Sequence, residues 1–239
     1  DASLLDLVGD EDRLAFTTDS YVVRPIFFPG GDIGKLAVCG TINDLAMRGA
    51  WPLYLSVGFI LEEGLPLADL ERVVVAMATT ATQAGVRIVT GDTKVVERGA
   101  ADGLFINTAG IGRVPARVRI LASGIRPGDA VLLSGAVGDH GLAIMTQREG
   151  LRFGGALASD CAPLNGLVAD MLGGCPEIHA LRDPTRGGLA TTLNELAGQS
   201  HVGIEIDESA VPIHEPVPVA SELLGLDPLL GQLAEDVVV

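Results

Sequence analysis

The chain has 239 residues and a formal net charge of -15, and 48% of its residues are hydrophobic although only 4% are aromatic. This length suits one large domain or two modest ones, and we favour two. The negative charge repels nucleic acid and anionic membranes, so an anionic substrate such as ATP would need a divalent cation or local lysines here. The aliphatic, glycine-rich composition is typical of mixed α and β structure.

The three cysteines, Cys39, Cys161 and Cys175, are odd in number and widely spaced, without a CxxC pair. This pattern argues against a redox or zinc site and favours a reducing compartment. Charge, glycine or proline breaks every apolar run well before the roughly 20 residues that a membrane span requires. We find no signal peptide either, and we therefore expect a cytoplasmic protein.

The first half of the chain predicts a βαβαββ order of elements. The strands are expected over 13–20, 51–64, 86–96 and 104–114, and the helices over 32–50 and 66–85. Asp32 is a candidate N-cap of the first helix. The second helix, opened by Pro66 and closed by Gly85, is expected to bury one face. That face carries Leu67, Leu70, Val74, Met77, Ala81 and Ala84.

A turn-rich connection, "PARVRILASGIRPGD", separates the two halves and predicts a domain boundary near residues 114–128. The domains are accordingly expected over 1–114 and 128–239. The second half predicts strands "AVLLSG", "EIHALRD" and "VGIEID", and helices ending at Arg148 and over 164–172, 186–198 and 216–225. The fold class is thus α+β, with a mixed sheet and helices in the first domain and an α/β sandwich-like second domain.

The stretch "FFPGGDIGKLAVCGTINDLA" resembles a phosphate-binding loop at first sight, but it does not satisfy that signature. A phosphate loop needs a glycine five positions before Gly34 and a Ser or Thr after Lys35. Pro29 and Leu36 stand there instead. Phosphate chemistry would therefore have to be organised differently, with Lys35 either a cation for phosphate or an ordinary solvated lysine.

Four aspartates with small or hydroxylated neighbours are the candidate metal ligands: Asp1, Asp19, Asp44 and Asp92. Carboxylates at strand ends are the oxygen ligands that Mg²⁺ prefers when it also binds substrate phosphates. The simpler alternative is that each aspartate serves a turn or a helix cap. Asp44 is the clearest candidate, because it lies inside a predicted apolar helix where no cap is needed.

The segment "DPTRGG", residues 183–188, opens a predicted helix whose N-terminal amides could bind an anion, with Arg186 as an added cation. A proline-initiated helix capped by Asp183 explains the same spacing. His140 in "SGAVGDHG" is a candidate general acid or base, although a histidine in a glycine-rich turn more often packs or forms a structural hydrogen bond. The remaining histidines lack metal-ligand spacing.

Several longer strings resemble the HypE family of hydrogenase maturation proteins, which are carbamoyl dehydratases. They are "TTDSYVV", "PGGDIGKLAVCGTINDLAMRGA", "VRIVTGDTKVV", "SGAVGDHGLAIM" and "LRDPTRGGLATTLNELA". A core pattern of Asn-Asp-Leu, Gly-Asp-Thr and Asp-Pro-Thr-x-Gly-Gly is similar to the wider superfamily of aminoimidazole ribonucleotide synthetase, selenophosphate synthetase and thiamine phosphate kinase. The strings "PGGDIGKL" and "GDTKVV" point to HypE itself.

The resemblance implies a homodimer in which two N-terminal sheets close into a barrel, with ATP and Mg²⁺ bound near the dimer interface. The implied metal or phosphate-site aspartates are the four named above, with Asp92 also catalytic. Lys94 would lie beside the carbamoyl group and stabilise an oxyanion or O-phosphate, unless it simply faces solvent beside Glu97. The other implied ATP-binding residues are Lys35, Asn43, Thr93, Asp183, Thr185, Arg186 and Gly187.

The resemblance also implies the reaction. A C-terminal cysteine, carbamoylated by HypF, would be dehydrated with ATP to a thiocyanate, and the cyanide ligand would pass to the HypC-HypD scaffold for a [NiFe] hydrogenase. The sequence to Val239 contains no such cysteine tail, and Glu235 is not assigned to the family's C-terminal glutamate. Two alternatives stay open: another ATP-dependent small-molecule kinase or amidine-forming ligase of the superfamily, and a non-catalytic docking module.

Overall fold

A computed structural model describes the chain except for residues 1, 7–11, 152–156, 176, 186 and 230–239. It divides into two compact units. Unit 1 comprises residues 1–27, 31–118 and 162–176, and unit 2 comprises residues 28–30, 119–161 and 177–239. The segment 162–176 thus packs with the first unit although it lies in the second half of the sequence. None of the described helices combines the length and apolar character needed to cross a membrane.

Unit 1 is built on a five-stranded mixed sheet with the order β1-β2-β7-β5-β6. The pairs are antiparallel except β5 with β6, which is parallel. The predicted βαβαββ order is confirmed, whereas strand β1 and the two-stranded ribbon β3-β4 were missed. The strands are β1 Ser3–Asp6, β2 Arg13–Tyr21, β3 Phe27–Phe28, β4 Gly31–Asp32, β5 Trp51–Glu62, β6 Arg87–Val96 and β7 Leu104–Val114.

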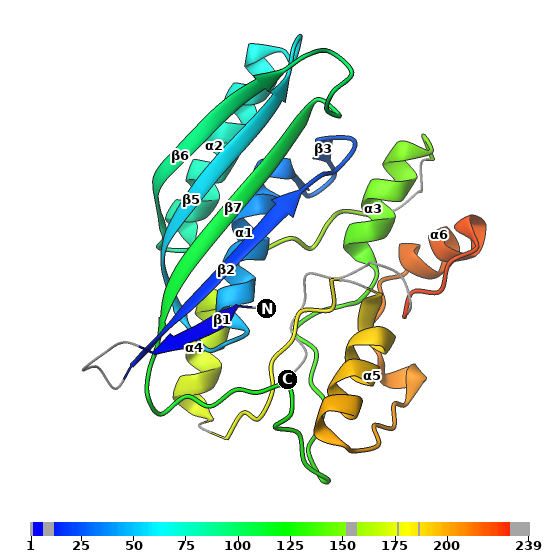
Figure 1. The fold of residues 1–239 in the computed structure, drawn as a ribbon. Helices are drawn as coiled ribbons and strands as arrows, with labels where there is room; N and C mark the ends of the chain where they lie inside the picture. Colours follow the sequence, from blue (N-terminus) through cyan, green and yellow to red (C-terminus); the bar gives the residue numbers. More distant parts are fainter. Residues whose placement is uncertain (1, 7–11, 152–156, 176, 186, 230–239) are drawn as a thin grey trace. The chain divides into compact units, whose positions relative to one another are not determined.

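Helices α1 (Ile33–Ala46) and α2 (Leu67–Gln83) lie on the same side of this sheet (Figure 1). Asp32 caps α1 as predicted, because its carboxylate accepts the amides of the first turn at 2.7 and 3.0 Å. Helix α1 is buried almost all round, while α2 has one buried side. The expected buried face of α2 was partly wrong: Leu67 and Val74 are exposed, and Val73 is buried instead.

The register of the sheet separates its two faces. Thr108 of β7 is fully buried and bonds to α1, so its cross-strand partner Asp19 also lies on this side, the helix face. The next residue, Asn107, points the other way. Asn107 is the cross-strand neighbour of Gly58 on β5, and Gly58 is in turn the neighbour of Asp92 on β6. Asp92 therefore lies on the same side as Asn107, which we call the open face because it is opposite to the helix face. This separation decides which candidate site residues can meet within one chain.

Unit 2 consists of helices α3 (Asp139–Arg148), α5 (Gly188–Ser200) and α6 (Pro216–Leu224) and a 3₁₀ turn, η1 (Glu208–Ala210). Helix α4 (Asn165–Gly174) belongs to unit 1. The three strands predicted in the second half were wrong: the described residues there form only isolated bridges, at Leu133 and Arg182. A strand requires a continuous hydrogen-bond ladder to a neighbour, and the described segments do not pair in that way.

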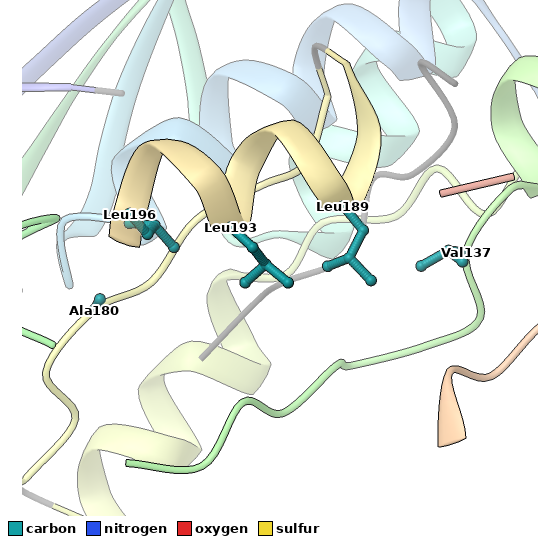
Figure 2. Packing of buried hydrophobic residues seen from close by; sticks show 5 residues of the cluster. All are labelled: Val137, Ala180, Leu189, Leu193 and Leu196. Carbon is teal, nitrogen blue, oxygen red and sulfur yellow. The ribbon is translucent and has the colours of Figure 1, made fainter. Parts of the chain in front are cut away.

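These extended segments pack by their side chains instead. Leu189, Leu193 and Leu196 recur at helical spacing along α5 and point toward Val137 and Ala180 on two separate segments (Figure 2). All are nearly fully buried. Of the runs that suggested strands, "EIHALRD" thus contributes Ala180 to this cluster, whereas Val131, Leu132 and Ile206 of the other two runs stay exposed.

Candidate functional site

Asp44 lies in the last turn of α1, on the side that packs against the sheet. Asp44 is only 8% exposed, and its Oδ2 accepts a hydrogen bond from Thr17 Oγ1 of β2 at 2.7 Å. A carboxylate among Ala, Leu and Ile residues costs free energy unless it is hydrogen-bonded. The structure therefore places Asp44 away from any capping position, as the sequence indicated, and connects it to β2.

Asp19 lies on the same helix face, two residues along β2 from Thr17. Tyr21, two residues further, donates from its hydroxyl to Asp19 Oδ2 at 3.4 Å and is 3.2 Å from Thr41 Oγ1 on α1. Thr41 in turn contacts the hydroxyl of Thr108 on β7. Asp19 and Asp44 are thus both positioned along the contact of β2 with α1, beside a line of buried hydroxyl groups.

Asp92 and Lys94 form a second, separate arrangement on the open face of the sheet. Lys94 Nζ lies 3.1 Å from Asp92 Oδ2, and both side chains are 71% exposed. The hydrogen bond from Lys94 is the main cause that lowers the pKa of Asp92, followed by the backbone amide of Thr93 at 2.9 Å. Asp92 is therefore kept ionised beside a cation.

The four predicted metal ligands do not form one group in the described structure. The sheet lies between Asp92 and the pair Asp19 and Asp44, and Asp1 lies outside the described residues. Within the described ranges no three His, Cys, Asp or Glu side chains could together hold a metal ion. Mg²⁺ is commonly held by only one or two carboxylates together with substrate phosphates, and the donors Asp19 and Asp44 fit that requirement.

Asn43 is buried and forms hydrogen bonds within unit 1. It is 1% exposed, its Nδ2 donates to Ala162 O at 3.0 Å, and its Oδ1 accepts from Leu164 N at 2.8 Å. Both ends of the amide hold the segment that leads into α4. Asn43 therefore serves the packing of unit 1, and its assignment as a cofactor ligand stays a prediction. Lys35 lies in the first turn of α1 and is partly exposed.

The predicted anion site at the start of α5 is only partly described. Arg186 lies outside the described residues, and the helix has Gly187 in a left-handed conformation as its N-cap. Asp183 accepts a hydrogen bond from Thr185 Oγ1 at 3.3 Å, so the expected role of Asp183 as the helix cap was wrong. A Cβ atom at Gly187 would lie 2.4 Å from the Thr191 hydroxyl, which explains the glycine.

His140 packs in the interior of unit 2. Its Nδ1 is 2.7 Å from Ser159 Oγ, its ring meets Phe28 edge-on, and burial lowers its pKa to about 4. Ser159 Oγ also accepts the amide of Cys161 at 3.1 Å. A histidine that stays neutral and connects two segments fits the packing role better than general acid or base catalysis. None of the three cysteines forms a disulfide: Cys39 and Cys161 are buried, and Cys175 is exposed.

Sequence reasoning missed the hydroxyl residues Thr17, Tyr21, Thr41 and Thr108. A partial signal exists in β2, because Thr17, Asp19 and Tyr21 recur at the period of a strand and so share one face. The hydrogen bonds that join Thr17, Tyr21, Thr41 and Thr108 to other elements span 20 to 71 residues of sequence, so only the fold brings the partners together.

Comparison with known proteins places this chain in a family. The model of the AIR synthase related protein, N-terminal domain, matches residues 1–114, and that of the C-terminal domain matches residues 126–239. A crystal structure of HypE in complex with ATP superimposes with a TM-score of 0.92 at 56% identity, covering 100% of this chain and 70% of that one. The chain belongs to the HypE family. The resemblance of its motifs to that family is thereby confirmed.

Two further HypE relatives show how much of the family's length is present. Carbamoyl dehydratase HypE of Cupriavidus necator is 61% identical over 217 residues, which are 91% of this chain and 62% of the relative. HypE in a crystal structure of the HypE-HypF complex has a TM-score of 0.90 at 52% identity, with 94% of this chain and 74% of that chain covered. This HypE-family chain therefore spans about three fifths of the length of the Cupriavidus protein.

Proposed function

We propose that this chain forms the ATP-binding part of a carbamoyl dehydratase of [NiFe] hydrogenase maturation. The observation that carries the proposal is the pair Asp19 and Asp44, held by hydroxyl groups along the contact of β2 with α1 in a chain that is 56% identical to a HypE solved with ATP. The substrate would be the carbamoylated cysteine at the C-terminus of the full-length protein, and the product a thiocyanate.

The proposed reaction has two steps. The carbamoyl oxygen attacks the γ-phosphoryl group of ATP and releases ADP, which turns a poor leaving group into a phosphate. The amide nitrogen then loses its two protons, the C–O bond breaks with release of phosphate, and the S-carboxamide becomes S–C≡N. Such phosphoryl transfer depends mainly on positioning and on electrostatic stabilisation of the phosphate oxygens.

The residues of this chain would supply that positioning. Asp19 and Asp44 would hold Mg²⁺, which neutralises charge on the phosphates when it is bound. Lys35, in the first turn of α1, would contribute a cation toward phosphate. Thr93 would donate to a phosphate oxygen, and Lys94, whose Nζ lies 3.1 Å from Asp92 Oδ2, would stabilise the O-phosphate of the carbamoyl group. The residues Asp183, Thr185, Arg186 and Gly187 stay candidates for further phosphate contacts, and Asp1 for a further carboxylate.

The sheet separates Lys94 and Asp92 from Asp19 and Asp44, so we propose that the site is completed by a second copy of the chain. Strand β6 is an edge strand whose residues are nearly all exposed, including Val89 and Val95. An edge strand presents unpaired backbone groups that can bind another chain unless they are covered. The open face also exposes the apolar side chains Phe16 and Ile60. A homodimer formed through this face would bring residues 92–94 of one copy toward the other.

The remaining proposals concern the setting of the reaction. Domains over 1–114 and 128–239 are supported by the ranges of the two family models. HypF as the carbamoyl donor is supported by the HypE-HypF complex of a relative, and a HypC-HypD scaffold would accept the cyanide. We place the protein in the cytoplasm, in keeping with cysteines that form no disulfide.

The test is the intact mass of the full-length protein after carbamoylation by its partner and addition of Mg²⁺ and ATP. We expect the carbamoyl adduct of the wild-type protein to lose the mass of one water, and the adduct of the Asp44→Asn variant to keep its mass. Asp102→Asn is the matched control, because Asp102 forms only an exposed ion pair with Arg24 among the contacts described. A wild-type adduct that persists in the presence of ATP would refute the dehydratase proposal.

A further inference from the structure

We infer that Tyr21 and Thr41 are positioning residues that orient the carboxylate of Asp19 for Mg²⁺ and ATP. The inference rests on the proposed function of Asp19 as a metal ligand. It assigns a role to two side chains that carry no charge and would not themselves contact the metal. The argument uses only unit 1, in which β2, α1 and β7 pack against one another.

The contacts form a continuous line of oxygen atoms. Tyr21 Oη lies 3.4 Å from Asp19 Oδ2 and 3.2 Å from Thr41 Oγ1. Thr41 Oγ1 contacts Thr108 Oγ1, which lies 3.4 Å from the backbone oxygen of Ala37. The line of oxygen atoms thus connects the Asp19 carboxylate on β2 with Thr41 on α1 and Thr108 on β7.

The direction of the hydrogen bonds follows from the number of protons. The ionised carboxylate of Asp19 can only accept, so Tyr21 donates to it. The Tyr21 oxygen is then left to accept from Thr41. The single proton of Thr108 can be donated either to Thr41 or to the backbone oxygen of Ala37 on α1. The two bonds from Thr41 through Tyr21 to Asp19 therefore have a defined direction, and they couple the position of Asp19 to that of α1, which also carries Asp44.

The packing around Tyr21 indicates that this arrangement is specified by the sequence. A Cβ atom at Gly40 would lie only 2.4 Å from Tyr21 Oη, so a glycine is required next to the hydroxyl. Thr41 and Thr108 are both 0% exposed within an otherwise aliphatic contact. Buried hydroxyls contribute little net stability compared with apolar side chains of similar shape, so a positioning role accounts for their presence here.

Residues that hydrogen-bond to metal ligands typically alter metal affinity by about 10- to 100-fold when they are removed. We therefore expect Tyr21→Phe and Thr41→Val each to weaken the Mg²⁺-dependent binding of a non-hydrolysable ATP analogue by about tenfold. Both changes remove a hydroxyl and keep the shape of the side chain. Binding of the analogue in EDTA should stay within about twofold of wild type, because the effect passes through the metal.

The chain offers a matched control, since it contains only two tyrosines. Tyr54 lies on the open face, where its hydroxyl bonds to Arg87 at 2.9 Å. Tyr54→Phe should leave Mg²⁺-dependent binding within about twofold of wild type. Calorimetry on the full-length protein measures all these affinities, and Mn²⁺ in place of Mg²⁺ allows the bound metal to be followed by electron paramagnetic resonance.

A double-mutant cycle separates positioning from a general structural effect. In an Asp19→Asn background, Tyr21→Phe should have almost no further effect on metal-dependent binding, because its target carboxylate is gone. Full additivity of the two changes, or wild-type affinity in Tyr21→Phe, would overturn the inference while leaving the proposed function intact. A wild-type protein without Mg²⁺-dependent binding would overturn the proposed function and the inference together.

Discussion

Asn43→Ala should destabilise unit 1, because the Asn43 amide holds the segment before α4 through two hydrogen bonds. Each such bond contributes about 1 kcal/mol, and more when its partner is left buried and unsatisfied. Replacement by Ala improves helix propensity by about 0.5 kcal/mol. The two terms together predict a net loss of about 2 kcal/mol. For a chain of this size that corresponds to a fall in Tm of about 4–8 °C.

Asn43→Asp is a stricter test of the same contact. Its carboxylate can still accept from Leu164 N, but it cannot donate to Ala162 O and would introduce a charge at a buried position. We expect a larger loss of stability than for Asn43→Ala. Urea denaturation followed by circular dichroism measures both, with Asn194→Ala as control, because the Asn194 amide bonds at an exposed site on α5. Stability changes below about 0.5 kcal/mol in both Asn43 variants, the range typical of surface substitutions, would refute the reasoning.

Three further predictions concern other contacts. Gly40→Ala should lower the Tm despite the better helix propensity of alanine, because the new Cβ would lie 2.4 Å from Tyr21 Oη. Adding Tyr21→Phe removes that oxygen and should restore part of the lost Tm. A higher Tm in Gly40→Ala alone would contradict the predicted clash. Burial lowers the pKa of His140 to about 4, so protonation of His140 favours the unfolded state. The free energy of unfolding should therefore fall by up to about 3 kcal/mol as the pH drops from 6.5 to 4. The His140→Gln variant should lack this pH-dependent loss of stability. Glu62 accepts the amides of Gly99 and Gly103 in the loop between β6 and β7 at 2.7 and 2.9 Å, so Glu62→Gln should speed hydrogen exchange of these two amides. Unchanged exchange rates would count against the two bonds.

The first half of the fold could be predicted because its local signals agree. Asp32 before an apolar helix, and the glycine and proline that bound α2, each mark an element boundary that the structure reproduces. The buried side of α2 was less predictable, because the run Val73-Val74-Val75 offers apolar residues on several sides. Close approach of α1 decides the matter: a Cβ atom at Gly34 would lie 2.5 Å from the backbone oxygen of Val73.

The second half could not be predicted in the same way. Segments such as "AVLLSG" and "VGIEID" have the composition of strands, but composition does not show whether a neighbour is available for pairing. In the described structure Leu133 and Ile204 pack against the leucines of α5 instead. Burial alone cannot distinguish an apolar strand from an apolar extended segment that covers a helix.

The sequence identified the charged residues of the candidate site, but it did not show which of them lie close together. Asp44 was identified because a carboxylate without a capping role is unusual in an apolar helix, and the structure places it within α1 and buries it. Asp92 was grouped with Asp19 because both end or follow predicted strands and have small or hydroxylated neighbours. Which face of a sheet each occupies depends on strand register across β7 and β5, and a single residue of slip would reverse it.

The distribution of the three cysteines gives each unit its own reporter of local opening. Cys39 lies in the core of unit 1 and Cys161 in that of unit 2, whereas Cys175 is exposed at the end of α4. A thiol reagent should modify Cys175 at once and reach the other two only when their surroundings open. Mass spectrometry of pulse-labelled protein would therefore measure the stabilities of the two units separately, without any substitution in the chain.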